Sequence, residues 1–469
     1  MIRFRTRHYD HDPACGNLIT FGTGDGFAAR VPLPFTKFVS ALFQAQHGRD
    51  VTATMHSLAT LRDFATGLPF ATHAFFACLC CLLLFRDVAP RLGLMDKPDA
   101  RKRHDSLVPL VGGPAVFVAV AASIAVFVPH SITALFVAIA FGVLLLGLLD
   151  DRYDLPVGLR IAAQLLIAWL TVALGGVEIH RIGNLVGFGI YEMEGLFAVI
   201  FSVMCIVGVI NSYNMIDGLD GLSASIALIS FIGIGVLCAT GGYEVGTRLA
   251  MIFGGALLGF LCLNARVFVP RARAFLGDSG STLIGFSLAW FFISLTQSDS
   301  RAMSPVAAGW LFGLPLLDTV SVMVRRISQG ISPMTAGRDH LHHRLVDAGL
   351  STNQTLAIMC VIQAAMVTVG VLTNPYPALE PWLFIGFVVL VIVYHLGLLS
   401  VIDRISTRLL MRGAQGSPTA VFDHLTPAVD TRPSRSKDAT LDTRLPATGN
   451  QKPGARQSER TEELDVPQL

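Results

Sequence analysis

Charged residues are scarce in this sequence. Asp, Glu, Lys and Arg make up 14% of its 469 residues, whereas a soluble globular domain carries about 25%. Hydrophobic residues make up 52%, so the composition excludes an ordinary soluble domain and indicates a polytopic membrane protein. The formal net charge of +2 does not point to a nucleic-acid partner, and we expect none.

The cysteines lack the paired spacing of zinc sites or disulfides. Cys78, Cys80 and Cys81 lie in one apolar run, and others lie singly in further apolar runs. We therefore expect small apolar side chains with weak thiols rather than ligands. Residues 1–54 also lack the hydrophobic region of a signal peptide. They are interpreted as a disordered extension or a wrongly assigned start, ahead of a membrane domain over 55–413.

Apolar runs fill the middle of the chain. Because a helix needs roughly 20 apolar residues to cross a bilayer, we expect an all-α fold with about 11 transmembrane helices. The expected spans are 68–85, 110–128, 132–149, 159–176, 195–211, 222–240, 246–263, 281–297, 304–324, 355–373 and 380–402. Residues 414–469 are rich in Pro, Thr, Ser and Arg, and are expected to form a disordered cytoplasmic tail.

Lys and Arg are distributed unequally over the connections between these spans. Alternate connections hold most of them, whereas the other set holds only Arg181, Arg248 and Arg301. The positive-inside rule places the basic set in the cytoplasm. An odd number of spans then puts the N-terminus outside and the C-terminus in the cytoplasm.

The stretch NSYNMIDGLDGL lies between two apolar runs. Asn211, Asn214, Asp217 and Asp220 recur there at every third residue. A carboxylate at the edge of a bilayer is costly unless it is paired, metal-bound or facing a polar cavity, and these oxygens suit a hard cation such as Mg²⁺. The same residue types also favour turns, so the stretch alone leaves both interpretations open.

Two further acidic clusters lie in the basic set of connections. In GLLDDRYDLP, Asp150 and Asp151 end an apolar span. Adjacent carboxylates repel unless a cation joins them, which indicates metal, substrate or proton chemistry, with a solvated turn as the alternative. In FLGDSGS, Asp278 lies in a glycine-rich turn before a span. Such a turn offers backbone N–H groups to a phosphate, and Asp278 could hold a bridging Mg²⁺.

Two clusters are basic. DKPDARKRH contains Lys97, Arg101, Lys102 and His104, and GRDHLHHRL contains Arg338, His340, His342 and His343. Phosphate-facing side chains are one interpretation of the first cluster, and an ordinary topogenic loop is the other. The histidine cluster lacks a zinc ligand set. It suits donors to a diphosphate, with a basic loop carrying incidental histidines as the alternative.

All of these clusters lie on the predicted cytoplasmic side, which indicates one active site on that face. Asp318, inside an expected span, is interpreted as structural rather than catalytic. A proton-coupled transporter is the alternative from another class. Such a protein would place its acids near the middle of the bilayer, often with internal repeats. No internal repeat is visible in this sequence.

The ordered set DKPDARKRH, LVGG, DDRYD, NSYNMIDGLDGL, FLGDSGS and SPMTAGRDHLHHRL resembles the polyprenyl-phosphate N-acetylhexosamine-1-phosphate transferase family. The resemblance covers about residues 55–413 and implies a multi-span helical fold with an outside N-terminus. It implies that Asp278 and Asn214 bind Mg²⁺, with Mn²⁺ as the alternative, and that Asp150 and Asp151 form a catalytic acid pair. Asp217 and Asp220 would line the nucleotide and metal site.

The resemblance also implies substrates and a location. The histidine cluster would contact the phosphate and sugar of the donor, and the basic first cluster and Asn211 would complete the substrate site. RKRH, PLVGG and SPMTAGRDHLHH favour UDP-N-acetylglucosamine over a muramyl-pentapeptide donor, and another UDP-N-acetylhexosamine is the alternative. The acceptor would be undecaprenyl phosphate, and UMP would be released. We expect the bacterial inner membrane and a role in starting O-antigen or a related cell-surface polysaccharide.

Overall fold

The computed structural model describes residues 50–96, 107–297, 301–333 and 337–398, with side chains from Thr66 onward. These residues all belong to one compact unit, Met1–Gly413. Most of the predicted N-terminal extension and the whole predicted tail lie outside the described residues, so those two assignments stay predictions. Helix α2 begins at Asp50, and the expected boundary after residue 54 therefore falls inside a helix.

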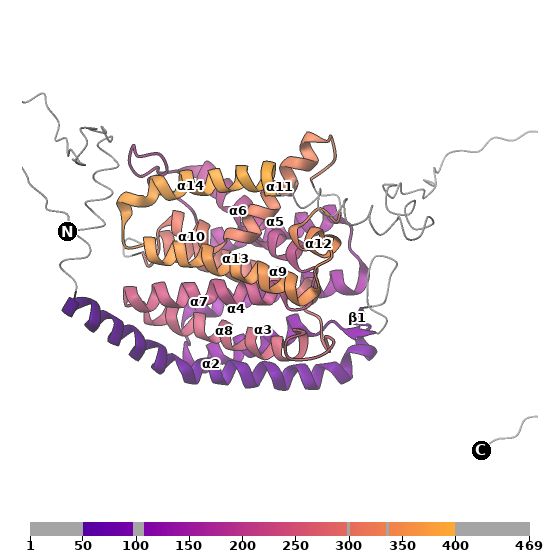
Figure 1. Ribbon diagram of the computed structural model, residues 1–469. Helices are drawn as coiled ribbons and strands as arrows, with labels where there is room; N and C mark the ends of the chain where they lie inside the picture. Colours follow the sequence, from indigo (N-terminus) through magenta and orange to yellow (C-terminus); the bar gives the residue numbers. More distant parts are fainter. Residues whose placement is uncertain (1–49, 97–106, 298–300, 334–336, 399–469) are drawn as a thin grey trace, which may run out of the picture. The chain divides into compact units, whose positions relative to one another are not determined.

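The described chain is almost entirely helical (Figure 1). Two short strands, β1 (Met95–Asp96) and β2 (Val108–Pro109), pair antiparallel with Met95 opposite Pro109. The helices are α2 (Asp50–Leu92), α3 (Gly112–Phe127), α4 (Ser131–Tyr153), α5 (Val157–Gly175), α6 (Gly195–Ile216), α7 (Leu222–Gly241), α8 (Glu244–Asn264), α9 (Gly277–Gln297), α10 (Pro305–Leu311), α11 (Gly313–Ser328), α12 (Leu341–Asp347), α13 (Thr352–Thr373) and α14 (Glu380–Val393).

Each expected apolar span coincides with a helix or a helix pair. Within the described residues, 9 helices are long and apolar enough to cross a membrane, and up to 10 if α10 and α11 count as one span. Helix α3 is apolar but has only 16 residues. The chain is therefore a polytopic helical protein, whereas the number of crossings and the sides of the termini stay predictions. The expected span 304–324 is not straight, because α10 and α11 meet at 81°.

Helix α9 lies at the centre of the helices. Its most apolar 18-residue window is 89% buried, and α4, α6, α3 and α10 pack around it. Gly147 of α4 permits the closest approach, because a methyl group in place of its hydrogen would overlap the backbone of Ser279. Helix α4 therefore brings its C-terminal end directly against the first turn of α9.

The segment LVGG also lies against the beginning of α9. Gly112 N donates to Phe275 O at 2.9 Å, and Gly113 N donates to Leu276 O at 3.1 Å. These bonds attach the chain that leaves the β1–β2 hairpin to FLGDSGS. Two motifs that are far apart in the sequence thus share one end of the helices, and β1 and α12 lie near that end in Figure 1.

Candidate functional site

The first turn of α9 is fixed by a carboxylate from α4. Asp151 Oδ1 accepts a hydrogen bond from Asp278 N at 2.7 Å, and its Oδ2 accepts one from Ser279 N at 3.1 Å. The first N–H groups of a helix have no partner within the helix, so a carboxylate there supplies both acceptors and a favourable charge. Asp151, which precedes Asp278 by 127 residues in the sequence, therefore caps the beginning of α9 and positions Asp278.

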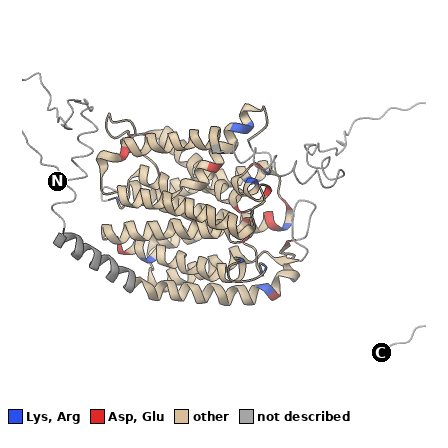
Figure 2. Cartoon of the chain, viewed as in Figure 1, with Lys and Arg blue, Asp and Glu red and all other residues tan. Residues whose placement is uncertain are grey.

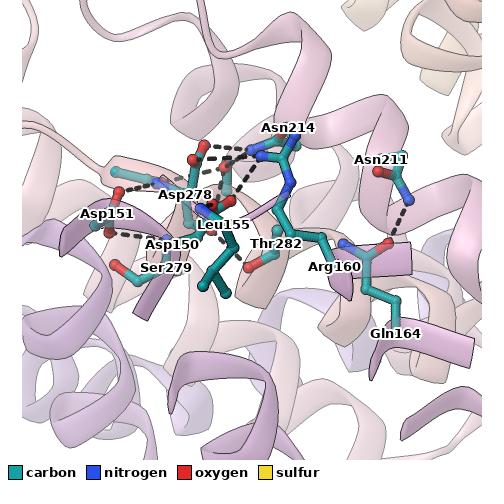
Figure 3. Close-up of polar contacts among 12 residues, drawn as sticks. Asp150, Asp151, Leu155, Arg160, Gln164, Asn211, Asn214, Asp278, Ser279 and Thr282 are labelled. Atoms are coloured by element: carbon teal, nitrogen blue, oxygen red, sulfur yellow. Dashed lines mark hydrogen bonds and ion pairs between the residues drawn. The ribbon is translucent and has the colours of Figure 1, made fainter. Parts of the chain in front are cut away.

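Asp150 points to a different partner. Its Oδ1 accepts from Leu155 N at 2.9 Å, and its Oδ2 accepts from Arg160 Nη1 at 2.6 Å. The same Arg160 nitrogen lies 3.9 Å from Asp278 Oδ2, and Figure 3 shows this guanidinium between the two carboxylates. The predicted acid pair thus divides, with Asp150 paired to a cation and Asp151 capping a helix.

Asn214 completes the contacts of Asp278. Its Nδ2 donates to Asp278 Oδ1 at 2.7 Å and to Ser281 Oγ at 3.0 Å. Asn211, one turn earlier on α6, instead donates from Nδ2 to Gln164 Oε1 at 2.7 Å (Figure 3). Of the two predicted amides, one therefore contacts the α9 carboxylate and the other contacts α5.

Asp217 and Asp220 follow the end of α6. Asp220 Oδ2 accepts from Arg266 Nε at 2.6 Å, so that carboxylate is neutralised. The half-buried Asp217 side chain has no hydrogen bond or ion pair to any residue that the structure describes. Burial is the main cause that raises the pKa of Asp217 well above its ordinary value, and repulsion from Asp278, Asp151 and Asp220 adds to it. A divalent cation would oppose that shift.

The histidine cluster begins α12 and is anchored by the buried Asp318. His340 Nδ1 lies 2.8 Å from Asp318 Oδ2, and Leu341 N donates to Asp318 Oδ1 at 3.0 Å. The prediction that Asp318 is structural agrees with this geometry. Arg326 supports the preceding loop by donating to Pro333 O and Asp339 Oδ2.

His342 contacts the NSYNMIDGLDGL stretch. It is fully buried, and neither of its ring nitrogens has a hydrogen-bond partner among the described residues. A methyl group at Gly218 would overlap His342 Nε2, so this glycine permits the contact. Burial and repulsion from His343 lower the pKa of His342 to about 3. Burial and the Arg338 charge lower the pKa of His343 to about 4. Both rings are therefore neutral at pH 7.

The remaining predicted site residues lie at the exposed edge of the histidine cluster or outside the described residues. Arg338 is half exposed and donates to Asp347 Oδ1 at 3.1 Å. Lys97, Arg101, Lys102 and His104 lie outside the described residues, so their predicted roles stay predictions. Figure 2 shows that charged residues gather at the ends of the helices, many of them at the end that holds this site.

The sequence interpretation missed Arg160. It lies on α5, near the start of the expected span 159–176, four residues before Gln164. A single arginine at the edge of an otherwise apolar run is costly without a partner, and this could have marked it. The nearby pair Asp150–Asp151 offered the partner, but the geometry that selects Asp150 is set by the packing of α4 against α5.

The site can supply oxygen ligands to a divalent cation. No group of three His, Cys, Asp or Glu residues close enough to hold a metal occurs among the described residues. Mg²⁺, however, is commonly held by one or two carboxylates with water and substrate phosphates. Asp278 and Asp217 fit that requirement. Asn214 meets Asp278 through Nδ2, so its amide must turn to present an oxygen to the same ion.

Comparisons with known proteins place this chain in a family. Residues 132–296 match the model of Glycosyl transferase family 4. The chain is 33% identical over 308 residues to the undecaprenyl-phosphate alpha-N-acetylglucosaminyl 1-phosphate transferase of Escherichia coli strain K12, covering 65% of this chain and 83% of that protein. The Haemophilus influenzae protein with the same name is 34% identical over 326 residues, covering 68% of this chain and 90% of its own length.

Proposed function

Since this chain belongs to glycosyl transferase family 4 and is a phosphoglycosyltransferase, we propose that it transfers N-acetylglucosamine 1-phosphate from UDP-N-acetylglucosamine to undecaprenyl phosphate and releases UMP. The observation that carries the proposal is the arrangement around Asp278, where α4, α5, α6 and α9 bring Asp150, Asp151, Arg160 and Asn214 together. The names of the relatives support the donor and the acceptor.

Phosphoryl transfer depends mainly on positioning and on neutralising charge. In this proposal Asp278 and Asp217 would hold Mg²⁺, and Asn214 would be a third ligand if its amide turned. The ion would neutralise the diphosphate of the donor and stabilise the leaving UMP. The gathered carboxylates support this assignment, because Asp150 and Asp278 share one arginine and Asp217 has no cation among the described residues.

The histidine cluster would receive the donor. His342 has two buried nitrogens without a partner among the described residues and lies against Gly218, next to Asp217. A neutral imidazole can donate to a phosphate oxygen from one nitrogen and accept from the other. His340, His343 and Arg338 lie in or beside the same first turn of α12 and would complete this surface.

The acceptor would enter from the bilayer. A pocket beside Asp150, Arg160 and Gln164 is otherwise lined mainly by apolar side chains, including Val143, Leu146, Ile167 and Ile210. Such a lining fits an isoprenoid unit, and Arg160 at the polar end fits its phosphate. A phosphate monoester has a second pKa of about 6, so the acceptor is largely a dianion at pH 7 and needs little deprotonation.

The location and pathway are part of the proposal. The basic connections support a site on the cytoplasmic face of the bacterial inner membrane. A lipid-linked N-acetylglucosamine would start O-antigen or a related cell-surface polysaccharide. Mn²⁺ is the alternative ion, and another UDP-N-acetylhexosamine is the alternative donor.

The test is UMP release by the purified full-length protein with undecaprenyl phosphate, Mg²⁺ and a panel of UDP-sugars. We expect turnover with UDP-N-acetylglucosamine and formation of the lipid diphosphosugar. Turnover with a different UDP-sugar would overturn the donor assignment and keep the chemistry. Absence of turnover with every donor, in a folded sample, would overturn the proposal and favour a transporter.

A further inference from the structure

The connection between α5 and α6 forms a rigid hairpin at the end of the helices away from Asp278. Ile182 N donates to Tyr191 O at 3.1 Å, Tyr191 N donates to Gly183 O at 3.1 Å, and Met193 N donates to His180 O at 2.8 Å. At the tip, Asn184 Oδ1 accepts from Gly187 N at 2.9 Å and from Gly189 N at 3.2 Å. The tip is therefore an ordered turn.

Two neighbouring helices hold the hairpin in place. Gln297, at the end of α9, accepts from His180 N and Arg181 N and donates to Arg181 O. Glu380, at the start of α14, accepts from Asn184 N at 2.9 Å. Figure 1 shows the connection between α5 and α6 beside the beginning of α14 rather than far beyond the helix ends.

This fixed hairpin exposes apolar side chains. Phe188 is 96% exposed, and Val186, Ile190 and Tyr191 are each more than half exposed. Residues 182–191 contain no charged residue. A rigid, uncharged tip that presents large apolar groups is costly in water, so it marks an interaction surface.

The exposed side chains continue the outward apolar faces of two candidate membrane spans. Leu196, Phe197 and Ile200 at the start of α6 are more than half exposed, and so is Trp382 near the start of α14. In a membrane protein such faces contact lipid. Tyr191 and Trp382 are also the residue types that gather at the interface between hydrocarbon and head groups.

We propose that the hairpin Arg181–Glu192 inserts its tip, Val186–Ile190, into the lipid leaflet at the end of the helices opposite Asp278. The occupant of this surface is the bilayer that surrounds α6 and α14. Arg181 and Glu192, which pair at 3.2 Å, stay at the base of the hairpin near the head groups. Because the tip is already ordered by Asn184, insertion requires little further loss of conformational entropy. The proposal is independent of the transferase reaction.

A photo-crosslinking residue at position 188 tests this. The full-length protein with p-benzoyl-phenylalanine replacing Phe188 is reconstituted in vesicles of phosphatidylethanolamine and phosphatidylglycerol, irradiated and analysed by mass spectrometry. Matched proteins carry the same residue at Phe197 on the lipid-facing side of α6 or at the exposed, charged position Glu244. We expect phospholipid adducts at 188 within about twofold of those at 197, and few at 244.

Two results would overturn the proposal. Position 188 could give no more lipid adducts than position 244 while position 197 gives many, which would place the tip in water. Irradiation in intact cells could instead link position 188 mainly to one protein of defined mass, which would make the hairpin a protein-docking surface. Because Phe188 contributes little to the buried core, the substitution leaves folding intact, and the adducts at 197 serve as the internal check.

Discussion

The hydroxyl of Tyr394 donates a hydrogen bond to Asp318 Oδ1 at 2.8 Å. Tyr394 begins a single π-helical turn, Tyr394–Leu398, that follows α14, whereas Asp318 lies on α11. Asp318 also bonds His340 Nδ1 and Leu341 N. The last described span thus fixes the carboxylate that orients the first histidine of the cluster, and π-helical turns are frequent at functional sites.

Tyr394→Phe is expected to weaken donor binding. Removing one donor from a buried carboxylate loosens Asp318 and, through it, His340, so we expect roughly a fivefold rise in KM for UDP-N-acetylglucosamine with a smaller change in kcat. Tyr191→Phe removes an exposed hydroxyl from the distant hairpin and should change neither value. If Tyr394→Phe lowers the thermal midpoint and leaves KM unchanged, the residue supports only the span.

Asp278→Ala is expected to abolish turnover and its Mg²⁺ dependence together. Asp278 is the carboxylate on which Arg160, Asn214 and the α9 cap converge, so we expect a loss of at least about 100-fold in kcat. The measurement is UMP release across a Mg²⁺ titration. Asp87→Ala removes an exposed carboxylate from α2 and is the control. Residual turnover that still rises with Mg²⁺ would contradict the ligand assignment.

Arg160→Gln is expected to lower both stability and activity. It leaves the buried Asp150 without its cation, which costs about 2 kcal/mol after allowing for the partial exposure of Arg160. The double variant Arg160→Gln with Asp150→Asn should recover most of the thermal midpoint and none of the activity. Arg248→Gln breaks an exposed pair with Glu244 and should change the midpoint little. Equal midpoints for Arg160→Gln and wild type would show that the ion pair stabilises nothing.

Acid should destabilise the histidine cluster. The folded-state pKa values of about 3 for His342 and about 4 for His343 lie below the ordinary value of about 6.5. Below pH 6.5 the two histidines bind more protons in the unfolded chain than in the folded one. The stability that the two neutral rings contribute is therefore complete above pH 6.5 and is lost as the pH falls toward their folded-state pKa values. His342→Gln removes one of these groups and should flatten the decline of the thermal midpoint between pH 6.5 and 4. An unchanged slope would contradict the shift for His342.

Composition and local motifs predicted much of this molecule. Apolar runs located each candidate membrane span among the described residues, because a span must satisfy its backbone internally and bury no unpaired charge. Glycine, Asp and Asn marked the end of α6 and the beginning of α9, where Asn214 and Asp278 meet. These signals are local, so a single sequence carries them.

Properties that depend on helix rotation and distant packing were not predictable. Asp150 and Asp151 are adjacent, yet only the position of α9 decides that one caps a helix while the other pairs with Arg160. The bend of 81° between α10 and α11 was also missed, because residues 304–324 read as one apolar run. Nothing in that run identifies Gln363, whose Oε1 accepts from Leu314 N just after the bend.

The contacts of Asp150 favour a positioning role over that of a general base. A general base must reach the proton that it removes, but Asp150 Oδ1 already accepts from Leu155 N and Oδ2 already accepts from Arg160 Nη1. A proton on Oδ2 would compete with the Arg160 ion pair. The acceptor phosphate is already largely a dianion at pH 7. We therefore expect Asp150→Asn to lose activity by about the same factor, roughly 100-fold, at every pH from 6 to 9. The check is kcat/KM for undecaprenyl phosphate across that range, with wild type in parallel. Recovery of the variant as pH rises would instead show that Asp150 removes a proton from the monoanion, and that its bond to Arg160 opens during turnover.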